Sequence, residues 1–250
     1  MISKAKIQYL QSLQQKKIRQ KLTIFVAEGE KICNEIIEQR QLEVEGIFAL
    51  SAWLQANKTT LSFYKNVLHE IDEAELKKIS SLSTPNQVLI VAKQPTHVLD
   101  KPHIEQDLSL FLDGIQDPGN LGTILRIADW FGIKWVFCAP NTVEVYNPKV
   151  VQASMGAFLR IKTQTLEMSA FRTLFPNLNV YGAVLGGENI FTTSLTKNAL
   201  LVIGNEGNGI SVEVQRQLTQ GITIPAYGDG AESLNAAVAT GIICAAMRNL

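Results

Sequence analysis

Three short stretches in the second half of the chain combine polar residues with several glycines, and each follows an apolar run. They are Asp113–Gly122, Gly204–Ser211 and Ile224–Asn235. A helical pattern follows each stretch, so the order strand, loop, helix occurs three times. In open α/β sheets ligands bind outside the carboxyl ends of the strands, and glycines allow a backbone to approach a ligand closely. The three stretches therefore predict one binding site at one edge of a parallel sheet.

Five polar side chains in or just after these stretches are candidates for chemistry at that edge: Asn120, Arg126, Glu206, Ser233 and Asn235. A guanidinium just inside a helix at the mouth of a sheet can hold a phosphate through two parallel hydrogen bonds. Each residue also has a local explanation. Asparagine and serine cap helices or bond nearby backbone. Glu206 could be a solvated loop carboxylate, and Arg126 could be a surface residue that pairs with Asp129 on its helix. These alternatives stay open for single residues, but the joint position of all five favours a functional site.

Several kinds of chemistry find no support in the sequence. The loop over 119–122 lacks the spacing of a dinucleotide fingerprint, and the Gly-Lys-Ser/Thr of a phosphate-binding loop does not occur. The three histidines and three cysteines show no metal-ligand spacing, so we expect no metal. The cysteines lie far apart in apolar runs, which indicates buried thiols in a reducing compartment. The N-terminus lacks a signal peptide and no apolar stretch is long enough to span a bilayer. We therefore expect a soluble cytoplasmic protein.

The charge of the chain is zero overall but unevenly distributed. Residues 1–95 carry 13 Lys and Arg against 10 Asp and Glu, a net charge of +3, and the remainder carries −3. Six cations precede the first acid of the chain: Lys4, Lys6, Lys16, Lys17, Arg19 and Lys21. Such a segment favours contact with phosphate groups, although a solvated basic face is the alternative.

The elements that must position these residues fall into two domains. Residues 1–93 predict a small α/β unit, with a weak strand over 63–68. Residues 94–106 are polar, contain two prolines and show no clear periodicity, which indicates a linker. Residues 107–250 alternate strands with helices, and this pattern predicts a parallel sheet covered on both faces. Within this second domain we expect helices over about 147–157, 211–219 and 233–247 and a short strand over 159–162.

The three stretches resemble the signature motifs of the SpoU family of RNA ribose 2′-O-methyltransferases, in the SPOUT superfamily. The first motif is similar to Asp117-Pro118-Gly119-Asn120-Leu121-Gly122-Thr123 with Arg126, the second to Gly204-Asn205-Glu206-Gly207, and the third to Ile224-Pro225 and Glu232-Ser233-Leu234-Asn235. The resemblance covers about 108–250. Residues 1–92 look like the family's small L30e-like RNA-binding domain, notably at Phe25-Val26-Ala27-Glu28-Gly29. Two departures are Ala236-Ala237, where Val-Ser is common, and Gln87, where glycine is frequent.

The resemblance implies methyl transfer from S-adenosylmethionine to a ribose 2′-hydroxyl of structured RNA, with rRNA favoured over tRNA. It implies a trefoil knot at the carboxyl end of the sheet and a homodimer with its active site at the subunit interface. Cofactor contacts fall near Gly204, Ile224 and Leu234, with glycine at 204 leaving room for the adenosine. Arg126 is the implied catalytic residue, and Asn120 and Ser233 would orient Arg126 or the ribose. Asn235 and Glu206 would support the knot loops and the dimer.

The N-terminal cations Lys16, Lys17 and Arg19 would then contact the RNA. Two other interpretations remain at this stage. One is a catalytically silent RNA-binding protein on the same fold. The other is a nucleotide-binding α/β protein unrelated to RNA, which would bind ATP or NAD instead of S-adenosylmethionine.

Overall fold

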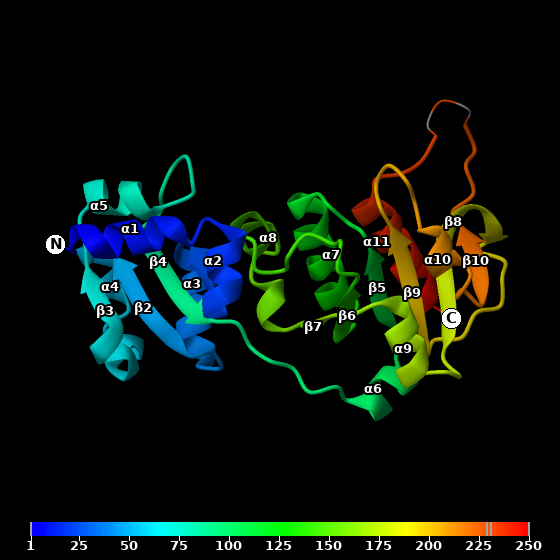
Figure 1. Cartoon of the computed structure of the whole chain (residues 1–250), viewed down its shortest axis with the longest axis horizontal. Coiled ribbons are helices and arrows are strands. Elements are labelled where there is room, and N and C mark those ends of the chain that lie inside the picture. The colour runs from blue at the N-terminus through cyan, green and yellow to red at the C-terminus, as the bar shows by residue number, and fades with distance from the viewer. Residues whose placement is uncertain (1, 229, 231, 250) are drawn as a thin grey trace. The chain divides into compact units, whose positions relative to one another are not determined.

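The computed structural model describes residues 2–228, 230 and 232–249, which divide into two compact units (Figure 1). Unit 1 comprises residues 1–96 and 146–156, and unit 2 comprises 97–145 and 157–250. Residues 146–156 thus group with unit 1, whereas the sequence analysis placed them in the second domain. They contain α8 (Pro148–Ala153), which packs against β1 (Ile24–Glu28).

Unit 1 is built on a four-stranded sheet in the order β1-β4-β2-β3. Strand β4 is antiparallel to both of its neighbours, and β2 is parallel to β3. The remaining strands are β2 (Val44–Ala49), β3 (Leu68–Glu70) and β4 (Val88–Lys93). The helices are α1 (Lys4–Ser12), α2 (Lys16–Leu22), α3 (Glu30–Gln39), α4 (Ser51–Ala56), the 3₁₀ helix η1 (Thr60–Val67) and α5 (Glu73–Ile79).

A buried carboxylate at the end of β1 holds a loop of this unit in place. Glu28 accepts hydrogen bonds from the Ser80 hydroxyl, from the Ser81 hydroxyl at 2.6 Å and from the Ser81 amide at 2.9 Å. Because Glu28 is only 6% exposed, these donors compensate the loss of water around the charge. The Phe25–Gly29 motif therefore has a structural role in fixing the segment that follows α5.

Unit 2 is built on a six-stranded sheet in the order β10-β8-β9-β5-β6-β7, and every adjacent pair is parallel. The strands are β5 (Ser109–Asp113), β6 (Trp135–Cys138), β7 (Lys162–Thr165), β8 (Asn179–Asn189), β9 (Ala199–Gly204) and β10 (Gln220–Thr223). From β5 the chain first builds β6 and β7 on one side. It then forms β8 on the other side, places β9 between β8 and β5, and adds β10 at the outer edge of β8. The order reverses between β5 and β9, which is where open α/β sheets bind ligands.

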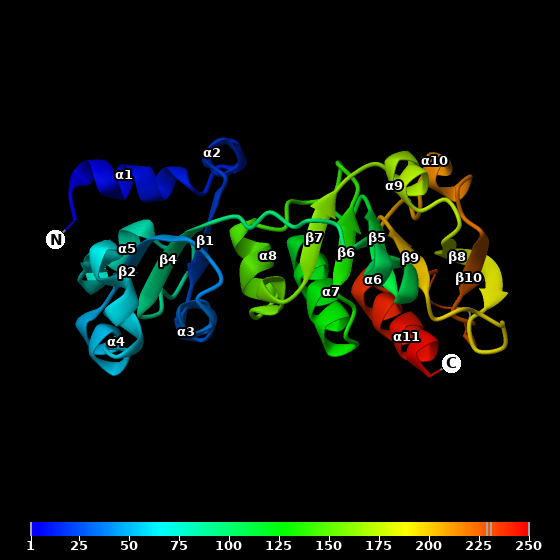
Figure 2. The same cartoon turned by 90° about the horizontal axis from the view of Figure 1, so that it is seen from below.

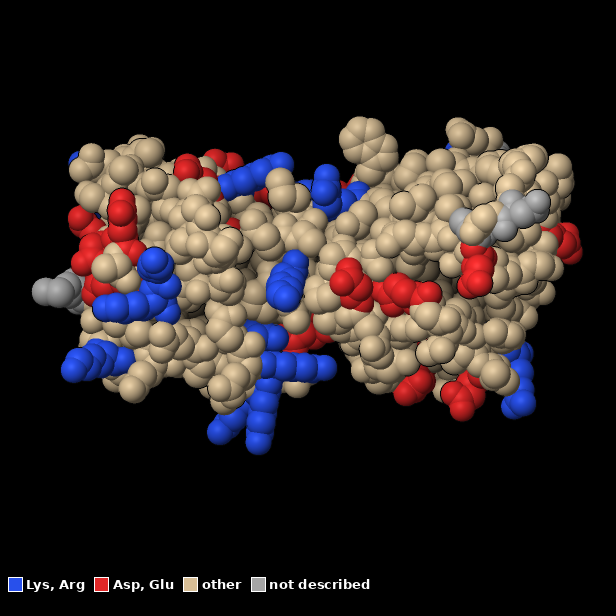
Figure 3. All heavy atoms as spheres, turned by 90° about the horizontal axis from the view of Figure 1, so that it is seen from above, with Lys and Arg blue, Asp and Glu red and all other residues tan. Residues whose placement is uncertain are grey.

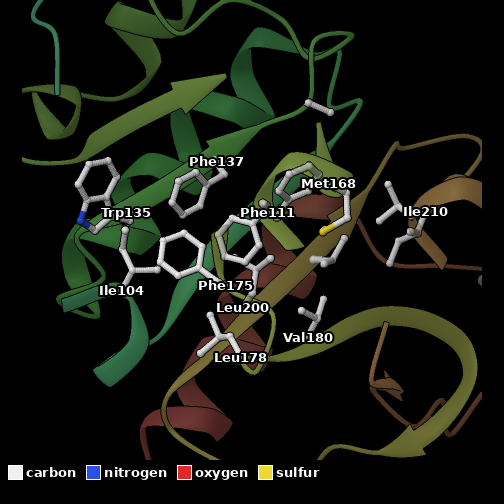
Figure 4. Close-up of a cluster of buried hydrophobic side chains, with 14 residues drawn as sticks. Ile104, Phe111, Trp135, Phe137, Met168, Phe175, Leu178, Val180, Leu200 and Ile210 are labelled. Carbon is white, nitrogen blue, oxygen red and sulfur yellow. The ribbon is translucent and has the colours of Figure 1, made fainter. Parts of the chain in front are cut away.

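Helices cover both faces of this sheet, as the sequence predicted. They are α6 (Lys101–Gln106), α7 (Pro118–Trp130), the 3₁₀ helix η2 (Ala157–Leu159), α9 (Met168–Leu174), α10 (Val212–Gln215) and α11 (Ala236–Arg248). In Figure 2, α7 and α11 lie on one face and α9 and α10 on the other. The core beneath α9 is aromatic, and Figure 4 shows Phe111, Phe137 and Phe175 clustered near Trp135.

Several boundaries differ from the expected ones. Residues 63–68 mostly belong to η1, because the apolar residues there follow a helical turn and only 68–70 pair with β2. The linker contains α6, which the side chain of Asp100 caps and Pro102 initiates. The helix expected over 147–157 ends at Ala153, the strand expected over 159–162 is β7 at 162–165, and the helix expected over 211–219 is shorter. The last helix begins at Ala236 rather than 233.

Candidate active site

The first and second motifs emerge side by side from the centre of the unit 2 sheet. Asp113 at the end of β5 pairs with Gly204 at the end of β9. The buried Asp113 carboxylate accepts a 2.6 Å hydrogen bond from the amide of Ser211, at the far end of the second motif. Asn205 Nδ2 donates to the carbonyl of Gly114 at 2.8 Å. Both motifs are therefore fixed to each other at the point where the strand order reverses.

A chain of side-chain hydrogen bonds connects all three motifs. Asn235 Nδ2 donates to Asn120 Oδ1 at 2.9 Å, and Asn120 Nδ2 donates to Glu206 Oε1 at 2.9 Å. Glu206 also accepts weaker bonds from the amides of Gln116 and Asp117, both at 3.3 Å. Three of the five residues singled out from the sequence therefore form one network, which we call the Asn–Asn–Glu relay (Asn235, Asn120 and Glu206).

The carboxylate of Glu206 is held in its charged form. Partial burial raises its pKa, but the hydrogen bonds donated by Asn120 and by the backbone amides outweigh that effect, so the pKa is lowered overall. The ionised group can only accept hydrogen bonds. This fixes the direction of the relay, because Asn120 must turn its amide nitrogen toward Glu206 and its oxygen toward Asn235.

The residues that cap α7 and α11 are not Asn120 and Ser233, which could have capped these helices. Asp117 caps α7 by accepting from the amide of Asn120 at 2.8 Å, so the side chain of Asn120 is free for the relay. Asn235, not Ser233, caps α11, with its Oδ1 accepting from the amides of Ala237 and Val238. Asp117 belongs to the first motif but was not one of the five candidate residues, although a short acid directly before proline is a recognisable signal for the start of a helix.

The second and third motifs line a cleft of about 1140 Å³ at the carboxyl ends of β8, β9 and β10. Its walls include the three positions expected to contact a cofactor, Gly204, Ile224 and Leu234, together with Ser233. The β8 segment Ala183–Leu185 forms a further part of the wall, which the motifs alone could not indicate. The cleft is large enough for a ligand of nucleoside size.

Gly204 is required by its own loop. A Cβ at this position would lie 2.2 Å from the carbonyl carbon of Gly209 and 2.3 Å from the amide nitrogen of Ile210. Both are backbone atoms that cannot rotate away. Glycine at 204 was expected to leave room for the adenosine, and the close approach of the loop backbone is an additional reason that holds without any ligand.

Arg126 lies apart from the relay. Its side chain is exposed on α7, is absent from the cleft wall, and has no hydrogen-bond or ion-pair partner within the described part of the chain. Asp129 pairs instead with Arg160, whose Nη2 lies 2.8 Å from Oδ2. The alternative in which Arg126 pairs with Asp129 is therefore wrong, and the guanidinium of Arg126 is available for an external group.

The three N-terminal cations expected to bind RNA do not behave alike. Lys16 and Lys17 are exposed on α2, and Figure 3 shows basic side chains projecting together over this helix. Arg19 is only 2% exposed, and its Nη1 donates to the carbonyls of Leu13 and Gln14, both at 2.7 Å. The expectation that Arg19 faces a ligand is wrong, because its charge is used to join α1 to α2.

Among residues 2–228, 230 and 232–249, there is no group of three or more His, Cys, Asp or Glu side chains placed to hold a metal ion. None of the helices described here combines the length and the apolar character needed to cross a bilayer.

Residues 107–245 match the sequence profile of the SpoU rRNA Methylase family, which is more than half of the chain. The chain belongs to the SpoU rRNA methylase family. Residues 4–90 match a second profile, the MRM3-like substrate binding domain. This match confirms the family membership that the three motifs predicted.

Full-length relatives support the same family. The chain is 26% identical over 242 residues to the 23S rRNA (guanosine(2553)-2′-O)-methyltransferase RlmP of Bacillus subtilis, covering 95% of this chain and 94% of that protein. A Porphyromonas gingivalis protein assigned to the TrmH family of RNA methyltransferases superposes with a TM-score of 0.87 at 38% identity, covering 100% and 99% of the two chains. An rRNA methyltransferase from Sinorhizobium meliloti, solved with AdoMet bound, has a TM-score of 0.88 at 25% identity, covering 100% and 96%. The α/β fold with a parallel sheet is therefore that of SpoU and TrmH methyltransferases.

Proposed function

We propose that this chain transfers a methyl group from S-adenosylmethionine to a ribose 2′-hydroxyl of ribosomal RNA. The observation that carries the proposal is the Asn–Asn–Glu relay, which ties the three family motifs together beside the cleft of unit 2. The 23S rRNA specificity of RlmP and the substrate-binding profile matched by residues 4–90 support rRNA as the substrate class.

The cleft fits S-adenosylmethionine. Its wall combines the loop over 204–209 and the segment 224–226 with the apolar residues Ile222, Leu234 and Ile243. Backbone donors and acceptors suit the polar edges of an adenosine, and apolar side chains suit its faces. The bound cofactor supplies an electrophilic methyl group on a sulfonium, so the protein has to align the ribose oxygen and stabilise its developing charge. We also propose that the loops around this cleft form the trefoil knot of the family.

Different residues of the chain would shape the cleft, align the ribose and stabilise the developing charge. The relay holds the first turn of α7, the loop after β9 and the start of α11 in one arrangement, which gives the cleft a fixed wall. Ser233 lies on that wall, and its hydroxyl has no partner within the described residues, so it is free to bond the ribose or a phosphate. Arg126 can hold an RNA phosphate or stabilise a developing alkoxide. A guanidinium is not expected to act as a base, because it keeps its proton in proteins.

Arg126 is not among the residues that line the cleft of its own chain, and we propose that it acts in the cleft of a partner subunit. The face of unit 2 formed by α7 and α11 supports this arrangement. Ile127 on α7 packs near Gly241 on α11, and both helices carry exposed apolar residues, with Trp130 84% and Val238 52% exposed. A symmetric dimer would bury this face on both subunits. We further propose a cytoplasmic enzyme, since all three cysteines are buried free thiols, as in a reducing compartment.

Methyl transfer from labelled S-adenosylmethionine to total rRNA from a strain lacking this gene tests the activity. Resistance of the modified position to alkaline hydrolysis would identify a 2′-O-methyl group. Transfer that persists when the target ribose is replaced by 2′-deoxyribose would refute ribose methylation. A protein that binds rRNA and never transfers the label would be the catalytically silent alternative.

Mixing two inactive variants tests the shared site. Arg126→Ala and Ser233→Ala subunits are co-expressed, and each mixed dimer then contains one cleft with both residues intact. Random pairing should restore about a quarter of wild-type activity. No recovery despite mixed dimers would place Arg126 and Ser233 in the same subunit's site.

A further inference from the structure

A guanidinium and an exposed aromatic ring are stacked on the surface of unit 1. The guanidinium carbon of Arg40 lies 3.4 Å from the centroid of the Phe63 ring. Phe63 is nevertheless 66% exposed. Since Arg40 covers one face of the ring, the exposed area must come from the other face and the edge. This leaves a flat aromatic surface open to solvent.

The backbone that carries the stacked pair is held in place by hydrogen bonds and by buried side chains. Arg40 ends α3, and its amide bonds to the carbonyl of Ile36. Tyr64, next to Phe63, donates its hydroxyl to the carbonyl of Ile37 at 3.4 Å. Leu61 and Trp53 are buried beneath the same segment. The ring of Phe63 is therefore attached to a fixed turn, which lowers the entropy cost of using it to bind a ligand.

The surroundings of the pair are basic and polar. No Asp or Glu occurs between Ser51 and His69, whereas Lys58 and Lys65 both lie there and are exposed. The other exposed side chains of this segment are mostly hydroxyls and amides, including Thr59, Ser62 and Asn66. Glu38 is a nearby acid on α3, so positive charge is present but moderate. An open ring among lysines and neutral hydrogen-bonding groups matches what unpaired nucleotides require.

We infer that Arg40 and Phe63 form a stacking platform for an unpaired base of the RNA substrate, with Lys58 and Lys65 contacting the flanking phosphates. This inference rests on the proposal that the substrate is RNA. It adds a particular binding surface to unit 1, separate from the basic helix α2. A purely internal cation–π pair would explain the contact with Arg40, but it would not explain the open ring face or the two exposed lysines in the acid-free segment that carries Phe63.

The test measures binding of a fluorescein-labelled, single-stranded 12-nucleotide RNA to the full-length protein by anisotropy. Phe63→Leu should weaken binding about tenfold, because one base loses its aromatic partner. Phe63→Trp should restore binding, since a larger ring also stacks. Lys58→Gln with Lys65→Gln should weaken binding through charge instead, reducing the slope of log K against log salt by about 0.7 for each lost phosphate contact. Phe63→Leu should leave that slope unchanged.

Phe191→Leu is the matched control, because Phe191 in unit 2 is also 60% exposed but has no cation over its ring among the described residues. It should bind the oligonucleotide like the wild type. Wild-type affinity in Phe63→Leu, or equal losses in both leucine variants, would overturn the platform. Methyl transfer to rRNA by the wild type is measured separately, so that loss of the proposed function and loss of the platform are distinguishable.

Discussion

Asn235 donates a hydrogen bond to Asn120 across 115 positions of the sequence, with 2.9 Å between Nδ2 and Oδ1. The same Asn235 side chain caps α11 through its oxygen. One residue therefore fixes the start of the last helix and connects it to the first turn of α7. The placement of the cleft wall depends on this bond, because Ser233 and Leu234 directly precede Asn235 in the chain.

The loss of stability caused by replacing Asn120 should depend on whether the new side chain is charged. Asn120→Ala removes one donor from Glu206 and one acceptor from Asn235, at a cost of about 0.5–1.5 kcal/mol in the free energy of unfolding. Asn120→Asp should be worse at neutral pH, because two carboxylates would then face each other. Its defect should shrink from about pH 8 to about pH 5 as one of them takes up a proton, while the alanine variant shows no such recovery. Thermal melts at both pH values provide the measurement.

The lowered pKa of Glu206 predicts how the stability of the wild-type protein depends on pH. Its folded-state pKa lies below the ordinary value of 4.5, so the charged relay stabilises the fold at neutral pH. That contribution is lost as pH falls through the lowered pKa. Glu206→Gln should therefore be less stable than the wild type at neutral pH and should converge with it in strong acid. Parallel curves across the acid range would show that the charge of Glu206 contributes nothing.

Substitution of Gly204 should damage the loop as well as the cofactor site. Gly204→Ala places a Cβ within 2.3 Å of backbone atoms of Gly209 and Ile210, so the loop after β9 must shift. We expect weaker S-adenosylmethionine binding together with a lower melting temperature. Gly228→Ala is the control, because Gly228 lines the same cleft and a Cβ there would meet nothing within 4 Å. Calorimetric titration with the cofactor compares the two, and a Gly204 variant with unchanged stability would contradict the steric argument.

Arg126 should affect turnover far more than cofactor affinity. Arg126→Ala should lower single-turnover methyl transfer by roughly 10²–10³-fold, the size expected when one charge-stabilising donor is lost. Arg126→Lys should recover little, since an ammonium lacks the planar fork of a guanidinium. S-adenosylmethionine affinity should stay the same, because the positions expected to contact the cofactor, Gly204, Ile224 and Leu234, belong to the second and third motifs. Wild-type turnover in the alanine variant would shift the catalytic role to Asn120 and Ser233.

Substituting the exposed lysines of α2 and substituting its buried arginine should have different effects. Changing Lys16 and Lys17 to Gln should weaken RNA binding and flatten its salt dependence by about 0.7 per contact, without affecting stability. Arg19→Gln should instead destabilise unit 1, because it leaves the carbonyls of Leu13 and Gln14 without their charged donor. RNA titrations at several salt concentrations and thermal melts are run on both variants. An unchanged salt slope in the lysine variant would leave α2 as a solvated basic face.

The sequence allowed the strand–loop–helix repeats and the three motifs to be predicted, because those depend on apolar periodicity and on local residue types. The role of Arg19 was predicted wrongly, because the sequence shows its charge but not the carbonyls that surround it after folding. The strand predicted over 63–68 was wrong for a related reason: a short apolar run fits a 3₁₀ turn and a strand equally well until its neighbours are known. The bond between Asn235 and Asn120 lay beyond prediction from local pattern, because it depends on the order in which distant strands join the sheet.

Residues 146–156 have a consequence for how this protein can be cut and recombined. They group with unit 1, where the ring of Tyr146 lies 5.1 Å from that of Phe25, although the chain before and after them belongs to unit 2. The polypeptide therefore crosses between the units three times, after residues 96, 145 and 156. A single protease nick near residue 96 would leave both fragments holding part of unit 1. A chimera that takes its substrate-binding unit from another family member must import two separate segments, and one of them lies inside the methylase sequence itself.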